Sequence, residues 1–272
     1  MKKEKITPTQ RALNFWAVIL IIWAFYRNYF QMPEWFDEFI AKPLVFVLPV
    51  FYYIKNVDKK PVLESLYIHL KPKVIIKDIF NSLVIGGVFL LSAILSFYFR
   101  EKKIVLISNF PGWEKLFLII ITALATGITE EILSRGFVLK KLYNESKNIY
   151  SATFFSSILF FFLHVPILFT NPKITGNLLL MFMTTDLLLS MINGLIFLLE
   201  KSLVAPILIH AFYNIISKQR QIEIDTSKQI LDSDAGFEMV ELIKRSIRNE
   251  ISMAMFSQGN LSRSFVLKLV EV

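Results

Sequence analysis

Long apolar runs alternate with short polar segments along most of the chain. A helix needs about 20 mostly apolar residues to cross the ~30 Å hydrocarbon core of a bilayer. Runs close to that length predict about seven spans, the second and the last of them short. They cover approximately residues 13–30, 39–54, 79–99, 115–133, 149–169, 178–199 and 203–217. We therefore expect an all-α, polytopic helical membrane protein in which about seven to eight transmembrane helices enclose a polar cavity.

The composition supports an integral membrane protein and excludes several other classes. Hydrophobic residues make up 54% of the chain, which includes 26 Phe, and this is too apolar for an ordinary soluble domain. The chain has no cysteine, so disulfides and thiolate catalysis are excluded. The net charge of +8 fits the excess of Lys and Arg beside transmembrane helices, and no basic soluble face indicates nucleic-acid binding.

The distribution of basic residues predicts the orientation in the membrane. The N-terminal segment and the second and fourth loops hold more Lys and Arg than the other loops, so we expect a cytoplasmic N-terminus. No small-residue cleavage site follows the first apolar run, so we expect this run to be retained as a span. The usage of Ile, Phe and Lys is typical of a bacterium with an AT-rich genome, and we expect the bacterial plasma membrane as the location.

The chain divides into three regions. Residues 1–114 are expected to form N-terminal transmembrane helices, 115–217 a helical core, and 218–272 a polar amphipathic tail. In the tail, Asp232 offers a helix N-cap before a mixed amphipathic stretch that reaches Ile247. This stretch is expected to be a surface helix, either bound to the membrane surface or simply solvated. Seven spans would place the tail outside the cell although it is rich in basic residues, so its side is left open.

Three polar fragments interrupt the apolar runs of the core. They are Glu130-Glu131 with Arg135, Phe160 with His164, and His210 with Asn214. Ionisable groups at membrane depth cost about 2.5 kcal/mol or more each, so they indicate a functional site. Because residues four apart share a helix face, Glu131 and Arg135 are expected to form an ion pair, which leaves Glu130 free on another face. A free carboxylate of this kind is suited to act as a general base for water.

The two histidines complete a candidate hydrolytic site. A ring nitrogen of His164 can share the attacking water with Glu130. His210 and Asn214 lie one helical turn apart, so both can donate hydrogen bonds to one oxyanion. Alternatively, Glu130, His164 and His210 can bind a zinc ion that carries the water.

Each fragment alone also has a structural interpretation: an ion pair at a helix end, an interior histidine, or a hydrogen bond between helices. Asp186 and the pair Asn193-Gly194 lie in the sixth apolar run. They can line the same cavity, or they can merely pack and bend a helix. The joint occurrence of the three fragments, in order, on three apolar helices favours a functional site.

At these residues the chain resembles the CAAX-protease and bacteriocin-processing family of intramembrane endopeptidases, also called the Abi family. The family's pattern is Glu-Glu-x-x-x-Arg, then Phe-x-x-x-His, then His-x-x-x-Asn/Asp, and all three fragments match it. The resemblance covers approximately residues 116–217, including the approach from Glu200 to His210. It implies a helical fold with a cavity open to membrane and water, and cleavage of peptide bonds near the bilayer surface.

The resemblance also implies roles for the matched residues. Glu130 would be the catalytic base, with His164 helping to activate water, and His210 and Asn214 would stabilise the oxyanion. The residues expected to support the site are Glu131, Arg135 and Phe160. The family has been described both as metal-dependent and as glutamate-based without metal. The pairing of one glutamate with arginine favours the metal-free version, so we expect no cofactor, with zinc as the alternative.

The implied partners are a peptide or membrane-protein substrate and the lipid bilayer. Bacterial members are associated with bacteriocin self-immunity or peptide maturation, whereas eukaryotic members trim prenylated proteins, and nothing in this sequence indicates a prenylated substrate. The alternative is a non-enzymatic immunity or interaction protein that binds a peptide or protein in the membrane. A small transporter with a Glu/His proton relay is a weaker alternative, because the hydropathy pattern has no internal repeat.

Overall fold

A computed structural model of the chain describes residues 6–30, 32–69, 71–101, 112–170, 176–216 and 218. These residues form helices joined by turns, and none of them lies in a β-strand. The all-α class expected from the sequence is therefore confirmed. The described residues belong to one compact unit, Met1–Lys218. The amphipathic stretch expected between Asp232 and Ile247 lies outside the described residues.

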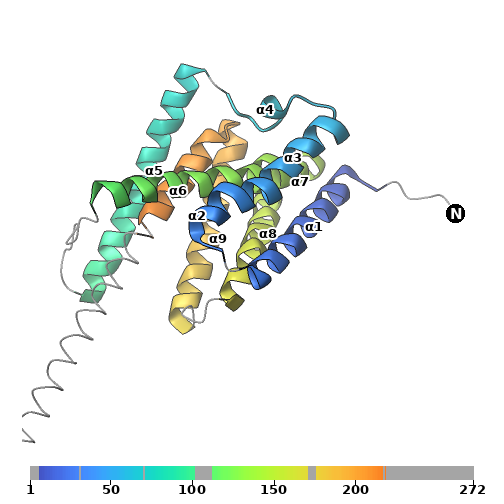
Figure 1. Ribbon diagram of the computed structural model, residues 1–272. Helices are drawn as coiled ribbons and strands as arrows, with labels where there is room; N and C mark the ends of the chain where they lie inside the picture. The colour runs from blue at the N-terminus through green and yellow to red at the C-terminus, as the bar shows by residue number, and fades with distance from the viewer. Residues whose placement is uncertain are drawn as a thin grey trace, which may run out of the picture. The chain divides into compact units, whose positions relative to one another are not determined.

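The helices follow one another in chain order in Figure 1. The α-helices are α1 Pro8–Tyr29, α2 Glu34–Phe36, α3 Leu48–Tyr52, α4 Val62–Ser65, α5 Pro72–Glu101, α6 Trp113–Glu131, α7 Lys140–Ser146, α8 Ile149–Thr170 and α9 Gly176–Glu200. The π-helical segments are η1 Asp37–Ala41, η2 Pro43–Val47, η3 Tyr53–Val57 and η4 Ile132–Leu139. An apolar helix, Val204–Ile216, ends this unit and is called the last helix below.

Four helices of the described residues are long and apolar enough to cross a membrane. They are Glu34–Val57, Trp113–Ser146, Ile149–Pro166 and Met183–Glu200. The last helix is apolar but shorter, in agreement with the short final run expected from the sequence. Helices α1 and α5, which coincide with the first and third apolar runs, are not among these four. The total of seven or eight spans remains a prediction.

The second apolar run is longer than expected. The sequence predicts a short span over residues 39–54, whereas the structure has one continuous helix, Glu34–Val57, that includes α2, η1, η2, α3 and η3. Pro43 and Pro49 lie inside it. A proline lacks a backbone N–H and normally interrupts a helix, but membrane helices tolerate it through local π adjustments, and π-helical turns flank both prolines.

The fourth run also extends beyond its predicted end. The sequence places the end of this span at residue 133 with a loop after it, but α6 continues through η4 and α7 to Ser146. The polar residues after position 133 are compatible with a helix because no proline occurs among them. The helix ends at Ser146, and the next residue, Lys147, has a left-handed φ of 54°. Every residue of η4 is buried, including the polar Ser134 and Arg135, so this segment is an interior helix rather than a loop.

Close contacts between backbones bring the site-bearing helices together. Helix α8 packs along both α9 and α1 (Figure 1). A Cβ atom added to Gly127 of α6 would lie 2.8 Å from the carbonyl oxygen of Ile207 in the last helix. A Cβ atom at Gly194 of α9 would lie 2.9 Å from Cγ2 of Thr153 in α8. Small residues allow this close approach in membrane proteins, so both glycines are required by packing.

Candidate active site

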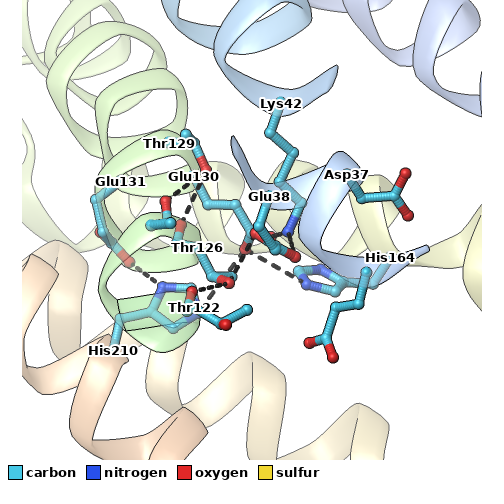
Figure 2. A network of polar contacts seen from close by, with 12 residues as sticks. Asp37, Glu38, Lys42, Thr122, Thr126, Thr129, Glu130, Glu131, His164 and His210 are labelled. Atoms are coloured by element: carbon cyan, nitrogen blue, oxygen red, sulfur yellow. Dashed lines mark hydrogen bonds and ion pairs between the residues drawn. The ribbon is translucent and has the colours of Figure 1, made fainter. Parts of the chain in front are cut away.

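Three ionisable side chains from three helices converge at one point. Glu130 is the last residue but one of α6, His164 lies in α8 and His210 lies in the last helix (Figure 2). Oε2 of Glu130 is 3.6 Å from Nε2 of His164 and 3.8 Å from Nε2 of His210. These separations exceed a direct hydrogen bond, and at such distances a water molecule can lie between polar groups. The structure therefore brings together the carboxylate and both histidines that the sequence singled out.

Glu131 occupies the centre of a second, fully buried set of contacts. Its Oε1 is 3.0 Å from Nη1 of Arg135, which is the ion pair predicted from the four-residue spacing. The same oxygen accepts a hydrogen bond of 2.8 Å from Nδ1 of His210 and one of 3.0 Å from Nδ2 of Asn193. Glu131 thereby joins α6, η4, α9 and the last helix. A carboxylate at Nδ1 fixes the orientation of the His210 ring, so that Nε2 faces Glu130.

Arg135 is only 1% exposed, and its guanidinium contacts several groups besides Glu131. Its Nη2 donates to the backbone oxygen of Ser190 at 3.1 Å, and its guanidinium lies 4.2 Å from the ring centre of Phe160. The Phe160 ring also meets the rings of His164 and His210, with centroids 4.8 and 5.8 Å away. Phe160 therefore contacts the arginine and both histidines.

The sequence analysis expected Glu130 to have no ion partner, but the structure provides one. Its Oε1 accepts a hydrogen bond of 2.7 Å from Nζ of Lys42, which comes from the helix Glu34–Val57. Lys42 also donates to Oε1 of Glu38 at 2.6 Å. The expectation failed because Lys42 is 88 positions away in sequence, and spacing within one helix does not reveal such a partner. A cation inside the second apolar run was the available signal.

Asp186 lies on the other side of His164 and was left undecided by the sequence. Its Oδ2 is 3.5 Å from Nδ1 of His164, and the residue is 5% exposed. Nδ1 of His164 also lies 3.2 Å from the backbone oxygen of Phe160. Both neighbours of Nδ1 accept hydrogen bonds, which favours a proton on Nδ1 and leaves Nε2 toward Glu130 as an acceptor. Asp186 thus contacts a histidine of the cluster and does not serve helix packing alone.

Asn214 is less buried than His210, and it makes fewer contacts with the other site residues. Asn214 lies one turn further along the last helix and is half-buried. Within the described ranges, no hydrogen bond or ion pair joins its side chain to Glu130, His164 or His210. Its amide is therefore placed near the cluster by helix geometry alone. Asn193, by contrast, contacts Glu131 directly, and its role was not identified from the sequence.

A small pocket lies beside Lys42, among the N-terminal helices. It has a volume of about 280 Å³ and is lined by residues that include Trp23, Arg27, Glu38 and Lys42. Asp37 at its rim accepts hydrogen bonds from Tyr26 and Arg27. The pocket therefore borders Lys42 and Glu38, the two residues of the helix Glu34–Val57 that contact α6.

The surroundings of Glu130 bear on whether a metal ion could bind there. Among the residues that the structure describes, no group of three His, Cys, Asp or Glu side chains is placed to hold one. The position next to Glu130 already has a cation, because Nζ of Lys42 lies 2.7 Å from Oε1. A second positive charge at this carboxylate would be repelled by the ammonium.

Comparisons with known proteins give one match. No curated protein and no solved structure matches the chain. Residues 112–216 match a family model described as type II CAAX prenyl endopeptidase Rce1-like. This segment contains all three polar fragments and excludes Lys42. The resemblance drawn from the motifs is thereby confirmed over residues 112–216, the segment that is similar to the CAAX-protease family model.

Proposed function

We propose that the protein is an intramembrane endopeptidase that hydrolyses a peptide bond near the membrane surface by means of glutamate-activated water. The observation that carries the proposal is the convergence of Oε2 of Glu130 with Nε2 of His164 and of His210, at 3.6 and 3.8 Å. The family match independently favours a protease of the CAAX type in the membrane. Membrane-spanning helices around these residues supply the dry surroundings in which such groups act strongly.

In the proposed mechanism, Glu130 accepts a proton from water through Oε2 while the water oxygen attacks the carbonyl carbon of the substrate. Nε2 of His164 accepts the second hydrogen bond from this water and orients it. The attack forms a tetrahedral intermediate with a negatively charged oxygen. Glu130 then gives the proton to the leaving nitrogen, the C–N bond breaks, and the products are a carboxylic acid and an amine.

His210 and Asn214 are proposed to stabilise the oxyanion. The contact of 2.8 Å between Glu131 and Nδ1 of His210 supports this role, because a carboxylate there stabilises an imidazolium that donates from Nε2. Arg135 and Asn193 in turn hold Glu131 in place. Preorganised donors of this kind typically contribute about 10²–10³ in kcat.

We also propose that the reaction needs no metal. The support is the ammonium of Lys42 beside Glu130, which supplies the positive charge that a bound ion would otherwise provide. Zinc on Glu130, His164 and His210 is the alternative that a metal analysis tests.

The substrate is proposed to be a peptide or a membrane protein, cleaved in bacteriocin maturation or self-immunity. The support is the usage of Ile, Phe and Lys, which is typical of a bacterium with an AT-rich genome. We propose further that the chain lies in a bacterial plasma membrane with a cytoplasmic N-terminus and seven or eight spans around a polar cavity. The basic residues beside the apolar runs support this orientation.

The test is quantitative mass spectrometry of new peptide termini in membranes from cells that make the wild type or Glu130→Ala. Glu114→Ala is the matched control, because Glu114 lies on the same helix but is exposed. We expect termini that occur with the wild type and with Glu114→Ala and vanish with Glu130→Ala. Termini that are independent of Glu130 would refute its role as base. Protection against a peptide toxin that survives loss of Glu130 and His164 would favour the non-enzymatic binding protein.

A further inference from the structure

We propose that Lys42 is a positioning residue for this reaction: it fixes one oxygen of Glu130 so that the other faces the two histidines. The inference rests on the proposed function and adds a residue outside the segment that matches the family model. Lys42 lies in the helix Glu34–Val57, so the N-terminal part of the chain would contribute to the active site.

The two carboxylate oxygens of Glu130 have different surroundings. Oε1 accepts the hydrogen bond from Nζ of Lys42, at 2.7 Å. Oε2 accepts no direct hydrogen bond and faces the histidine nitrogens. In the part of the chain that the structure describes, the bond from Lys42 is the only hydrogen bond to this carboxylate. Partial rotation of the side chain about its last torsion would turn the carboxylate oxygen away from the histidine nitrogens, and Lys42 is the group that opposes this rotation.

Lys42 is itself held in place by a closed ring of contacts. Glu38, one turn before it, accepts from Nζ through Oε1 at 2.6 Å. Oε2 of Glu38 accepts from the hydroxyl of Thr126 at 2.8 Å, and Thr126 lies one turn before Glu130 on α6. Two pairs with four-residue spacing, on two facing helices, are therefore joined at both ends (Figure 2). This ring fixes the position of the ammonium relative to α6.

The contacts of this ring are strong because the charged side chains are buried. The side chains of Lys42 and Glu130 are each 6% exposed, so little water competes for their contact. Removal of one partner of such a pair leaves the other charge buried and uncompensated. Loss of the ammonium would free Oε1 of Glu130 and leave Glu38 and Glu130 to repel each other. The carboxylate would then no longer be held in one orientation toward the water.

The test compares Lys42→Met with Lys141→Met in a peptide-cleavage assay with the purified proteins in lipid vesicles. The probe is a synthetic peptide that spans a junction at which the wild type, but not Glu130→Ala, produces new termini. Lys141 is the matched control because its Nζ also bridges two helical segments, through Asp58 at 2.6 Å, far from the cluster. We expect Lys42→Met to lower kcat about 10²-fold with KM nearly unchanged, and Lys141→Met to leave both unchanged.

Two results would overturn the inference: a kcat of Lys42→Met equal to that of Lys141→Met, or a rise in KM alone. Either leaves the proposed function intact as long as Glu130→Ala stays inactive, whereas absent cleavage by the wild type contradicts the proposed function itself. If Lys42→Met yields no folded protein, Lys42→Cys replaces it. The chain has no other cysteine, so 2-bromoethylamine rebuilds a lysine-like ammonium at this position alone. A gain of kcat over the same variant treated with neutral iodoethanol supports the inference, and equal rates of the two products refute it.

Discussion

Gly127→Ala should separate the two helices that carry Glu131 and His210. The new Cβ atom would lie 2.8 Å from the carbonyl oxygen of Ile207, whereas ordinary contacts begin at 3.4 Å. The helices must therefore move apart locally by about 0.6 Å, the difference between these two distances. Glu131 is one turn after Gly127, and His210 is one turn after Ile207. The Glu131–His210 contact of 2.8 Å would lengthen toward 3.4 Å, outside the range of a good hydrogen bond.

The matched control is Gly87→Ala in α5, where an added Cβ atom meets nothing within 4 Å and the residue is exposed. Both variants gain the same helix propensity, up to about 1 kcal/mol, because glycine is unfavourable in a helix. The difference between the two variants therefore isolates the packing cost, which we expect to be about 1–3 kcal/mol. It is measured as the free energy of unfolding in a titration with denaturing detergent, together with cleavage activity.

We expect Gly127→Ala to be the less stable of the two and to lose activity, while Gly87→Ala keeps the wild-type activity. Equal free energies of unfolding for the two variants would refute the close approach of α6 to the last helix. Lower stability with full activity would refute the claim that the Glu131–His210 contact depends on this approach.

Three further predictions address the site. Arg135→Ala leaves the buried Glu131 without its cation, so we expect a loss of about 3–5 kcal/mol in the free energy of unfolding as well as lost activity; unchanged stability would contradict the scaffold role. Asp186→Asn removes the carboxylate that lies 3.5 Å from Nδ1 of His164. We expect kcat to fall at least about tenfold, with KM and stability near wild type. An unchanged kcat would contradict the idea that Asp186 orients the ring of His164. Cleavage by the purified protein should survive exhaustive chelation, whereas stoichiometric zinc and an activity loss that zinc reverses would contradict the metal-free proposal.

Contacts within one helix could be predicted from the spacing of residues in the sequence. The Glu131–Arg135 ion pair follows from four-residue spacing, and the structure contains it. The meeting of Glu130, His164 and His210 was suggested by their joint occurrence on apolar helices and by the family's pattern. Helix ends were harder to predict from the sequence, because the helix after residue 133 continues through polar residues that become buried against other helices. Tertiary burial, rather than local composition, decides the structure of such a segment.

Long-range partners were not accessible from the sequence. The contact between Lys42 and Glu130 depends on how the second run packs against α6, and hydropathy carries no information about this packing. Asn193 was noticed only as part of an Asn-Gly pair, although its amide contacts Glu131. An ionisable residue inside an apolar run is nevertheless a detectable signal. Lys42 carries this signal as clearly as Glu130 does.

The most direct test of the central claim is the ratio of kcat/KM between the wild type and Glu130→Gln, measured in vesicles on the peptide identified from new termini. Glutamine keeps the shape of the side chain but does not take up a proton from water. General-base catalysis contributes about 10²–10⁴ to the rate, so the account predicts a fall in kcat/KM of at least about 10²-fold for folded Glu130→Gln. A ratio within about threefold of unity would contradict the assignment of Glu130 as the base.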